Sequence, residues 1–273
     1  MVREVDNCMN AFLNKNIAIT GGSSGLGLAL AAALVQRGAQ VTLIARDPTR
    51  LAAARSQLLE SKPAASVETI AIDITDRAQT AAAFGSIGSL DILINSAGIL
   101  NEGRFDLQPE DEFEAVIQTN LLGTVNTTRA ALPLLKASDG RLVNIASLAG
   151  LMGVYGYTAY SASKHALVGF TESLRFELEQ DGVTVHLVCP SEFDSPMVDA
   201  LDRTRSPENR AHVLTLPKVE VEKIVSATLR GVERNQFFIV PGARARAAAF
   251  GGRLAPGITR RVGDRVVAKA RRK

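Results

Sequence analysis

The sequence has no tryptophan and contains little cysteine or histidine. Its 273 residues include two cysteines, Cys8 and Cys189, and three histidines, His165, His186 and His212. Two cysteines do not build a disulfide scaffold, so a reducing, cytoplasmic compartment is expected. No group of cysteines and histidines has metal-ligand spacing, which argues against a structural metal site.

Long apolar runs are also missing. No stretch of about 18 apolar residues is present, so we expect no membrane-spanning helix. The first fifteen residues carry Arg3, Glu4, Asp6 and Lys15 and have no long apolar core, so we expect no secretory signal. With 46% hydrophobic and 22% charged residues, the composition is that of a folded globular chain, not of a disordered or fibrous one.

Short β-rich runs alternate with longer Ala- and Leu-rich runs along residues 1–242. The apolar runs are continuous, as expected for strands that helices cover on both faces. The alternation predicts a single α/β domain built on a doubly wound parallel sheet of about seven strands. The expected strands are 17–20, 40–45, 67–72, 90–95, 141–146, 183–188 and 237–240, and the expected helices are 25–37, 48–61, 76–86, 109–136, 158–180 and 219–230.

Residues 191–217 depart from this alternation. They are polar, contain three prolines and lack strand character. We interpret them as a mobile, helical flap beside a substrate pocket.

The tail, residues 243–273, carries ten Lys or Arg against one acid, whereas the rest of the chain has a net charge of −6. Ile258, Val262 and Val266 recur every four residues beside basic side chains, a pattern typical of an amphipathic helix on an anionic membrane surface. A solvated helix that packs over the protein's own substrate mouth, or on a partner subunit, is the alternative. Nucleic-acid binding is disfavoured by the acidic body and by the lack of interleaved aromatic residues.

A glycine-rich turn joins the first expected strand to the first expected helix. Its glycines permit a tight turn and a close approach of the backbone to a pyrophosphate, and the helix N-terminus offers N–H donors to that anion. The spacing G-x-x-x-G-x-G differs from the G-x-G-x-x-G fingerprint, and a glycine-rich turn without a ligand is the alternative. The expected cofactor contacts in this turn are Gly21, Ser23, Ser24, Gly25, Leu26 and Gly27.

The end of the second expected strand bears on the choice of cofactor. Ala45 takes the position where sites for NAD usually place an acid, and Arg46 follows it. An arginine there suits a 2′-phosphate, so NADP(H) is favoured over NAD(H). The alternative is a solvated Arg46 that pairs with Asp47.

Tyr160 and Lys164 are four residues apart at the start of an expected helix, which places them on one face. A nearby ammonium lowers the pKa of a phenol, so the pair is a plausible proton donor and acceptor for interconversion of a carbonyl and an alcohol. Ser147 ends the strand before it, where ligands gather in parallel sheets. The alternatives are a surface pair for Tyr160 and Lys164, and a cap or turn role for Ser147.

The ordered set of motifs resembles the short-chain dehydrogenase/reductase family over roughly residues 14–240. The loop from Pro190 to Pro196, followed by Pro207-Glu208, is similar to the 3-ketodihydrosphingosine reductase branch. Residues 130–136 and 147–150 are similar to 11β-hydroxysteroid dehydrogenases. The motifs that carry the family resemblance are Gly21-x-x-x-Gly25-x-Gly27, Asn95-Ser96-Ala97-Gly98, Asn120, Ser147 and Tyr160-x-x-x-Lys164.

The resemblance implies a Rossmann-type domain that binds a nicotinamide cofactor, and it implies catalytic roles. Tyr160 would be the acid/base, Lys164 would bind the nicotinamide ribose and depress the pKa of Tyr160, and Ser147 would stabilise the substrate oxygen. Asn120 would hold a water in a proton relay to Lys164. The alternative for Asn120 is a side chain that bonds backbone inside its own helix.

The resemblance also implies further cofactor contacts. Asp73 would meet the adenine amino group, although a turn acid that caps the next helix is a compatible alternative. Ser191 replaces the glycine that commonly follows Pro190, which leaves open how this loop meets the nicotinamide. The other implied contacts are Ile74 against the adenine ring, Asn95, Ala97 and Gly98 beside the adenosine ribose, and Pro190 and Phe193.

The function expected from the resemblance is NADP(H)-dependent interconversion of a ketone and a secondary alcohol on a lipophilic substrate of 3-keto sphingoid, steroid or 3-oxoacyl type. A non-catalytic protein that senses NADP(H) on the same fold is the alternative. Met152, Tyr155 and Met197 are expected in the substrate pocket, with ordinary packing as the alternative. Helices 109–136 and 158–180 resemble the family's subunit contacts, which implies a homodimer or homotetramer.

Overall fold

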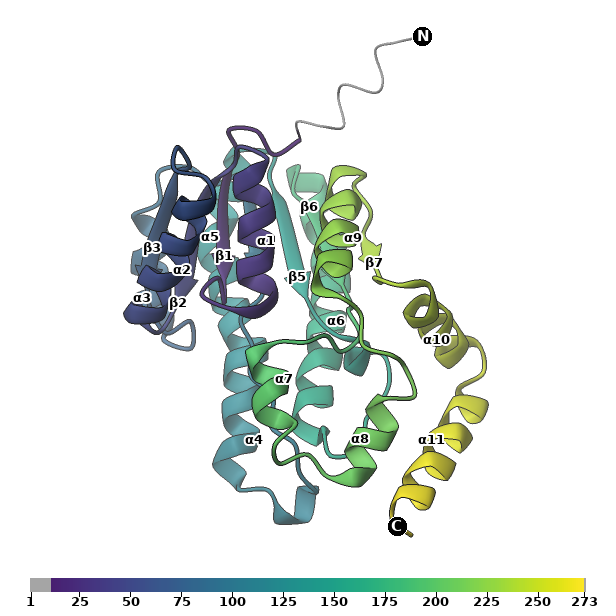
Figure 1. Cartoon of the computed structure of the whole chain (residues 1–273). Coiled ribbons are helices and arrows are strands. Elements are labelled where there is room, and N and C mark those ends of the chain that lie inside the picture. Colours follow the sequence, from purple (N-terminus) through teal and green to yellow (C-terminus); the bar gives the residue numbers. More distant parts are fainter. Residues whose placement is uncertain (1–10, 273) are drawn as a thin grey trace.

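Seven parallel strands form one sheet in the order β3-β2-β1-β4-β5-β6-β7 (Figure 1). The structure is a computed structural model that describes residues 11–272, so Cys8 lies outside the described residues. The strand order reverses between β1 and β4, and ligands bind at such a switch point in doubly wound sheets. The predicted strands are confirmed, as β1 Asn16–Thr20, β2 Gln40–Ala45, β3 Val67–Ala71, β4 Ile92–Asn95, β5 Arg141–Ile145, β6 Thr184–Val188 and β7 Phe238–Ile239.

Helices cover both faces of the sheet because successive side chains of a strand point to opposite sides. Ile17 and Ile19 of β1 pack in one apolar cluster with α1 (Gly25–Gln36), α2 (Pro48–Ser61) and α9 (Val221–Glu233). Ala18, between them, belongs to a second cluster with α3 (Arg77–Gly85), α5 (Thr124–Ala137) and α6 (Thr158–Leu178). The sheet therefore has a buried core on each face, as the continuous apolar runs predict.

The predicted helix over 109–136 is confirmed as one helical stretch, but a π turn inside it was not predicted. The chain forms α4 (Glu110–Ile117), a π-helical segment (Gln118–Gly123) and then α5. Single π turns inside α-helices are frequent at functional sites. Here the π turn contains Asn120, whose side chain is used outside its own helix.

The flap and the tail are helical, as predicted. The flap contains α7 (Pro196–Leu201) and α8 (Pro207–Val213), each with proline at its first position. Ser195 and Ser206 precede these prolines, and each serine side chain accepts a backbone hydrogen bond from the first turn of its helix. The tail forms two helices, α10 (Ala243–Leu254) and α11 (Pro256–Ala270).

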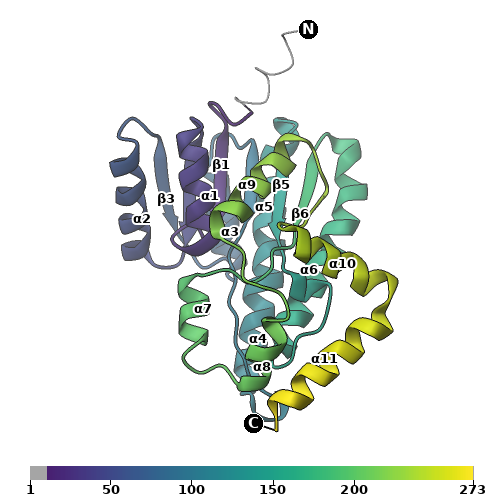
Figure 2. The same ribbon diagram turned by 45° about the vertical axis from the view of Figure 1, so that its right-hand side comes forward.

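Helix α11 packs along α8 of the flap (Figure 2). The tail therefore packs on the flap, whereas its position over a substrate mouth and its contact with a membrane stay predictions. The break at Ala255 follows from Pro256, which disfavours helical backbone at the preceding residue. No helix in the described part of the chain has the length and apolar content needed to cross a bilayer.

Candidate active site

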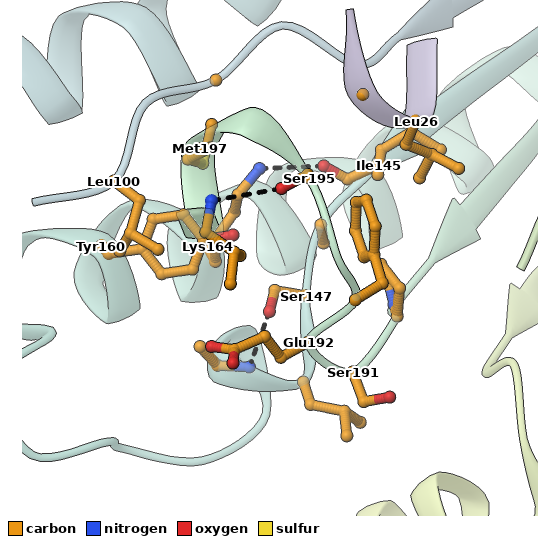
Figure 3. A pocket seen from close by; sticks show the side chains of 18 of the residues that line it. Leu26, Leu100, Ile145, Ser147, Tyr160, Lys164, Ser191, Glu192, Ser195 and Met197 are labelled. Atoms are coloured by element: carbon orange, nitrogen blue, oxygen red, sulfur yellow. Dashed lines mark hydrogen bonds between the residues drawn. The ribbon is translucent and has the colours of Figure 1, made fainter. Parts of the chain in front are cut away.

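A cavity of about 240 Å³ opens at the carboxyl edge of the sheet, between the strand ends and the flap (Figure 3). It is lined by the glycine-rich turn after β1, the segments after β4, β5 and β6, helix α6 and both flap helices. The fold thus brings together motifs that are far apart in the sequence. The predicted site residues that line it are Gly21, Ser24, Gly25, Leu26, Gly27, Ala97, Gly98, Ser147, Met152, Tyr160, Lys164, Pro190, Phe193 and Met197.

The glycine-rich turn has the backbone geometry that its sequence predicts. Gly21 has φ +68°, and a Cβ on it would lie 2.8 Å from the Cα of Ala97. A Cβ on Gly27 would overlap the carbonyl oxygen of Gly21. A side chain at either position would push the turn away from α1 and from the segment after β4. The two glycines therefore hold the first turn of α1 against the cavity.

Lys164 is buried at the floor of the cavity. Its Nζ donates a hydrogen bond to the carbonyl oxygen of Ile145 over 2.9 Å, and only 5% of the residue is exposed (Figure 3). Burial lowers the pKa of the Lys164 ammonium to about 8. The Nζ lies 5.7 Å from the centre of the Tyr160 ring, so the two side chains share one face as predicted.

The predicted lowering of the Tyr160 pKa is not what the structure shows. Burial raises the pKa of the Tyr160 phenol to about 12, and the neighbouring Ser147 hydroxyl acts in the opposite direction. Removal of water outweighs other effects here, and the Lys164 ammonium is directed at a backbone carbonyl. The phenol is therefore protonated at neutral pH, which suits a proton donor.

Ser147 follows β5 and has two roles. Its Oγ accepts a hydrogen bond from the backbone N–H of Ala149 over 3.1 Å and so caps the short turn Leu148–Gly150. The cap role considered from the sequence is therefore real. Because the Oγ only accepts in that bond, its own proton is left to donate into the cavity.

Asn120 connects two walls of the site. It is fully buried, and its amide exchanges hydrogen bonds with the backbone N–H and carbonyl of Ile99 over 2.8 and 2.9 Å. Its Nδ2 also donates to Ser163 Oγ, which in turn donates to the carbonyl oxygen of Tyr160. The alternative of bonding within its own helix is wrong, because the side chain holds the loop after β4 against α6. Its role in a water relay stays a prediction.

Asn95 steadies the sheet below the cavity. Its side chain donates to Asn144 Oδ1 over 2.9 Å and to Thr128 Oγ1 over 3.1 Å, and it accepts from Thr127 Oγ1 over 2.7 Å. The residue is 2% exposed and does not line the cavity. Its direct effect is to join β4, β5 and α5.

Arg46 and Asp73, two of the residues predicted around the adenosine and its phosphate, lie outside the cavity lining. Arg46 Nη1 is 3.9 Å from Asp73 Oδ2, and both side chains are exposed at the edge of the sheet. The proposed pairing of Arg46 with Asp47 is wrong, because Asp47 caps α2 through the N–H groups of Thr49 and Arg50.

The helix-cap alternative for Asp73 is also wrong. Asp76 caps α3, whereas Asp73 accepts hydrogen bonds from the N–H and the hydroxyl of Thr75. Ile74 is buried, and a Cβ on Gly123 would lie 2.7 Å from its side chain. Ser23 likewise does not line the cavity. Contacts of these residues with a cofactor stay predictions.

A buried ion pair in the cavity wall is absent from the sequence predictions. Arg205 has a side chain 1% exposed and donates to both carboxylate oxygens of Glu192, over 3.0 and 2.7 Å. It also donates to the Tyr157 hydroxyl over 3.3 Å, and the Tyr157 ring packs edge-on against Tyr160. No sequence signal marks Arg205, because a buried arginine and a solvated one look alike until the fold is known.

Tyr155 lies outside the cavity lining, in contrast to the pocket position expected for it. Its ring packs against the Arg271 guanidinium of α11, 5.5 Å from the ring centre. His212 takes a place in the lining instead, and its Nδ1 accepts a hydrogen bond from the backbone N–H of Tyr155 over 3.1 Å. The pocket wall on this side is thus fixed by contacts between flap and tail.

The fold and the site define a class of protein, an α/β oxidoreductase with a dinucleotide-type glycine turn and a Tyr–Lys–Ser cluster. Residues 15–206 match the family described as short chain dehydrogenase. The chain belongs to this family, whose members bind a nicotinamide cofactor.

Individual relatives narrow the comparison. A 3-dehydrosphinganine reductase of Arabidopsis thaliana is 37% identical over 186 residues, which are 67% of this chain and 56% of the relative. The chain thus spans little more than half the length of that relative. A 3-dehydrosphinganine reductase of Danio rerio is 31% identical over 81% of this chain and 69% of its own length. The chain is therefore related to the ketosphinganine reductase branch.

Solved structures agree on the fold. A short-chain dehydrogenase of Burkholderia cenocepacia in complex with NADP has a TM-score of 0.77 and 28% identity, covering 90% of this chain and 96% of its own. A member from Burkholderia phymatum in complex with NAD has a TM-score of 0.76 and 26% identity, covering 87% and 92%. Both cofactors thus occur among the structural neighbours.

Proposed function

We propose that the protein uses NADP(H) to interconvert a ketone and a secondary alcohol on a lipophilic substrate. One observation carries the proposal: Tyr160, Ser147 and Lys164 meet in the same cavity as the glycine-rich turn. An intact set of this kind has no use in a protein that only senses a nucleotide. The presence of the complete set therefore argues against the alternative of a non-catalytic protein that senses NADP(H).

The residues present fit a dinucleotide. The turn at Gly21 and Gly27 leaves no room for side chains and sets the N-terminus of α1 against the cavity, where N–H groups favour a pyrophosphate. Lys164 offers its remaining ammonium protons toward the ribose region. When bound, the nicotinamide supplies the hydride.

The protein's own groups handle the proton and the substrate oxygen. Ser147 donates a hydrogen bond that fixes the carbonyl oxygen, and the protonated Tyr160 phenol delivers the proton as the alcohol forms. Burial keeps that phenol protonated at neutral pH, as a proton donor requires. Glu192 and Arg205, paired beside Tyr157, hold the flap against the Tyr160 helix.

The choice of NADP(H) rests on the end of β2. Ala45, the last residue of β2, offers no carboxylate to a ribose, and Asp47 uses its carboxylate as the cap of α2. Arg46 lies exposed at this edge of the sheet, 3.9 Å from Asp73, and its guanidinium is available to a 2′-phosphate.

The nature of the cavity wall supports a lipophilic substrate. The relatives named as 3-dehydrosphinganine reductases, and a ketoacyl reductase of Nostoc that is 34% identical over 226 residues, favour a 3-keto lipid over a steroid. The apolar side chains of the wall include Leu148, Met152, Val154, Met197, Val213 and Leu216.

The proposed assembly is a homodimer or homotetramer in a reducing, cytoplasmic compartment. Leu122 and Phe176 are 40% and 65% exposed on the two helical stretches that the family resemblance assigns to subunit contacts. Burial of such side chains between subunits would remove apolar surface from water. Buried Cys189, whose thiol pKa burial raises to about 12, suits a compartment in which thiols stay reduced.

The test is a paired fluorescence titration of NADPH and NADH, followed by turnover of long-chain 3-keto lipids, steroids and small ketones. We expect tighter binding of NADPH and turnover of the 3-keto lipids. Binding of NADPH with no turnover of any ketone in the panel would contradict the proposed reaction. Binding of neither nucleotide would contradict the cofactor site.

A further inference from the structure

Each of the two tail helices presents a pair of apolar side chains to solvent. Phe250 and Leu254 of α10 are 59% and 84% exposed, and Ile258 and Val262 of α11 are 65% and 48% exposed. Single exposed apolar residues are ordinary, but a pair four residues apart on each of two consecutive helices indicates an interaction surface.

The inner side of α11 is fixed by its packing on the flap. Gly263 is buried, and a Cβ on it would lie 3.1 Å from His212 Nε2 of α8. Arg271 pairs with Glu208 of α8 over 3.6 Å and stacks on Tyr155. The orientation of α11 about its own axis is therefore set, and its opposite side faces outward.

The outward side of α11 carries positive charge and no acid. At 3.6 residues per turn, Arg261, Arg265 and Lys269 project within about 60° of Ile258 around the helix axis. All three are exposed. The single acid of the tail, Asp264, projects about 120° away from Ile258. Apolar and cationic side chains thus share one face, and the acid is outside it.

The inner sides of the two tail helices lie beside the active-site cavity. A Cβ on Gly252 of α10 would lie 3.9 Å from Met152 Cε, and Met152 lines the cavity. His212, against which α11 packs, lines the cavity too. Figure 2 shows α10 followed, after a bend, by α11, which runs beside α8 of the flap.

We propose that this outward face docks on an anionic phospholipid bilayer. We call it the tail face and define it as Phe250, Leu254, Ile258, Arg261, Val262, Arg265 and Lys269. Lys and Arg side chains are drawn to anionic headgroups, and apolar side chains between them enter the headgroup boundary. The body of the chain, with a net charge of −6 outside residues 243–273, is repelled by such a surface, so contact is directed to the tail.

The bilayer contact goes beyond the proposed reaction. Transfer of a lipophilic ketone from the bilayer into the neighbouring cavity rests on the proposed function, whereas the docking itself does not. The two can therefore fail separately.

The test is co-sedimentation of the full chain with vesicles of phosphatidylcholine alone and with 30% phosphatidylserine (about the anionic fraction of a charged leaflet). We expect binding to the anionic vesicles only, weakened by salt. Arg261→Glu with Arg265→Glu and Lys269→Glu should weaken binding by at least about tenfold, because each cation near the surface contributes. Ile258→Ser with Val262→Ser should weaken it as well.

The matched control carries the same charge change on exposed residues elsewhere, Arg77→Glu with Arg129→Glu and Arg234→Glu. It should bind as the unaltered chain does. Absence of binding by the unaltered chain, or equal loss in both triple variants, would overturn the proposal. Light scattering of the Ile258→Ser, Val262→Ser variant distinguishes a second copy: a smaller assembly with unchanged vesicle binding would also overturn it. Because no turnover is measured, an inactive chain that binds leaves the docking intact.

Discussion

At the scale of single residues, the site depends on how burial changes ordinary side chains. Burial moves the pKa of Lys164 down to about 8 and that of Tyr160 up to about 12, so both differ from their values in water. Arg46, in contrast, is exposed, and its proposed role depends on its charge. Two substitutions test these different roles.

Tyr160→Phe keeps the ring and removes the phenolic proton. We expect kcat to fall by about 10²- to 10⁴-fold, the usual contribution of a general acid, with little change in NADPH affinity. Steady-state kinetics and a fluorescence titration of the same preparation check this. A kcat close to that of the unaltered protein would remove Tyr160 from the proposed mechanism.

Arg46→Ala should weaken NADPH by about tenfold, because a charged hydrogen-bond partner of the 2′-phosphate is lost. NADH has no 2′-phosphate, so its affinity should hardly change. Both dissociation constants come from fluorescence titration, with Arg77→Ala as a control on another exposed arginine. An equal effect on the two nucleotides would contradict the assignment of Arg46.

At the scale of elements, buried polar groups fix how strands, helices and flap meet. His186 in β6 is fully buried and bonds the carbonyl oxygen of Gln236 through Nδ1 over 2.7 Å. Arg205 pairs with Glu192 inside the flap, and it joins the flap to the start of α6 through the Tyr157 hydroxyl. His186 is buried in its uncharged form, and Arg205 is buried against Glu192. The free energy of unfolding should therefore depend on the protonation of His186 and on the presence of both members of the ion pair.

His186 should make the protein sensitive to acid. Burial lowers its pKa in the folded state to about 4, below the ordinary 6.5, so the unfolded chain binds more protons between these values. This contribution is complete above pH 6.5 and is lost progressively toward pH 4, by up to about 3 kcal/mol. Urea unfolding at several pH values measures it. His186→Asn keeps a donor near the Nδ1 position and should flatten the dependence in this range, and an unchanged slope would contradict this source.

Removal of the Arg205 side chain should destabilise the protein, because the buried Glu192 carboxylate then lacks its cation. Arg205→Met leaves the Glu192 carboxylate in the wall without its guanidinium, so we expect a loss of about 3 kcal/mol in the free energy of unfolding. The double variant Arg205→Met, Glu192→Gln removes the buried charge and should be less destabilised than the single one. Equal losses in both variants, by urea unfolding, would show that the ion pair is not the cause.

At the scale of the whole molecule, the tail closes the structure over its own flap. Gly263 allows α11 to approach α8, because a side chain there meets His212. The C-terminal helices therefore support, from behind the flap, a pocket that is lined by the strand ends, α6 and the flap. The packing of α11 on α8, about 50 residues apart in the sequence, holds the polar flap in place as one wall of the pocket.

Gly263→Leu should lift α11 from α8. We expect the free energy of unfolding to fall by about 1–3 kcal/mol, as overpacking does, and KM for a lipophilic ketone to rise while NADPH affinity is kept. Gly257→Leu is the matched control, since no atom lies within 4 Å of a Cβ at that position of the same helix. Equal effects of the two variants would mean that helix propensity, not packing, is responsible.

The sequence by itself determined the alternation of strands and helices, the glycine turn and the Tyr160–Lys164 pair. These are local patterns: apolar runs, backbone freedom and spacing along one helix depend on near neighbours, and the seven strands were predictable for that reason. The short flap helices, which the prediction of a helical flap includes, also have local starts at Ser195-Pro196 and Ser206-Pro207.

Only the tertiary structure decided which polar residues are buried and what they contact. The Asn120 amide in the π turn bonds the loop after β4, 21 residues away in the sequence, and this contact exists only in the folded chain. The raised pKa of Tyr160 and the ion pair of Glu192 with Arg205 likewise depend on the exclusion of water by segments far apart in the chain. Burial and long-range contact are properties of the assembled molecule, so no local pattern announces them.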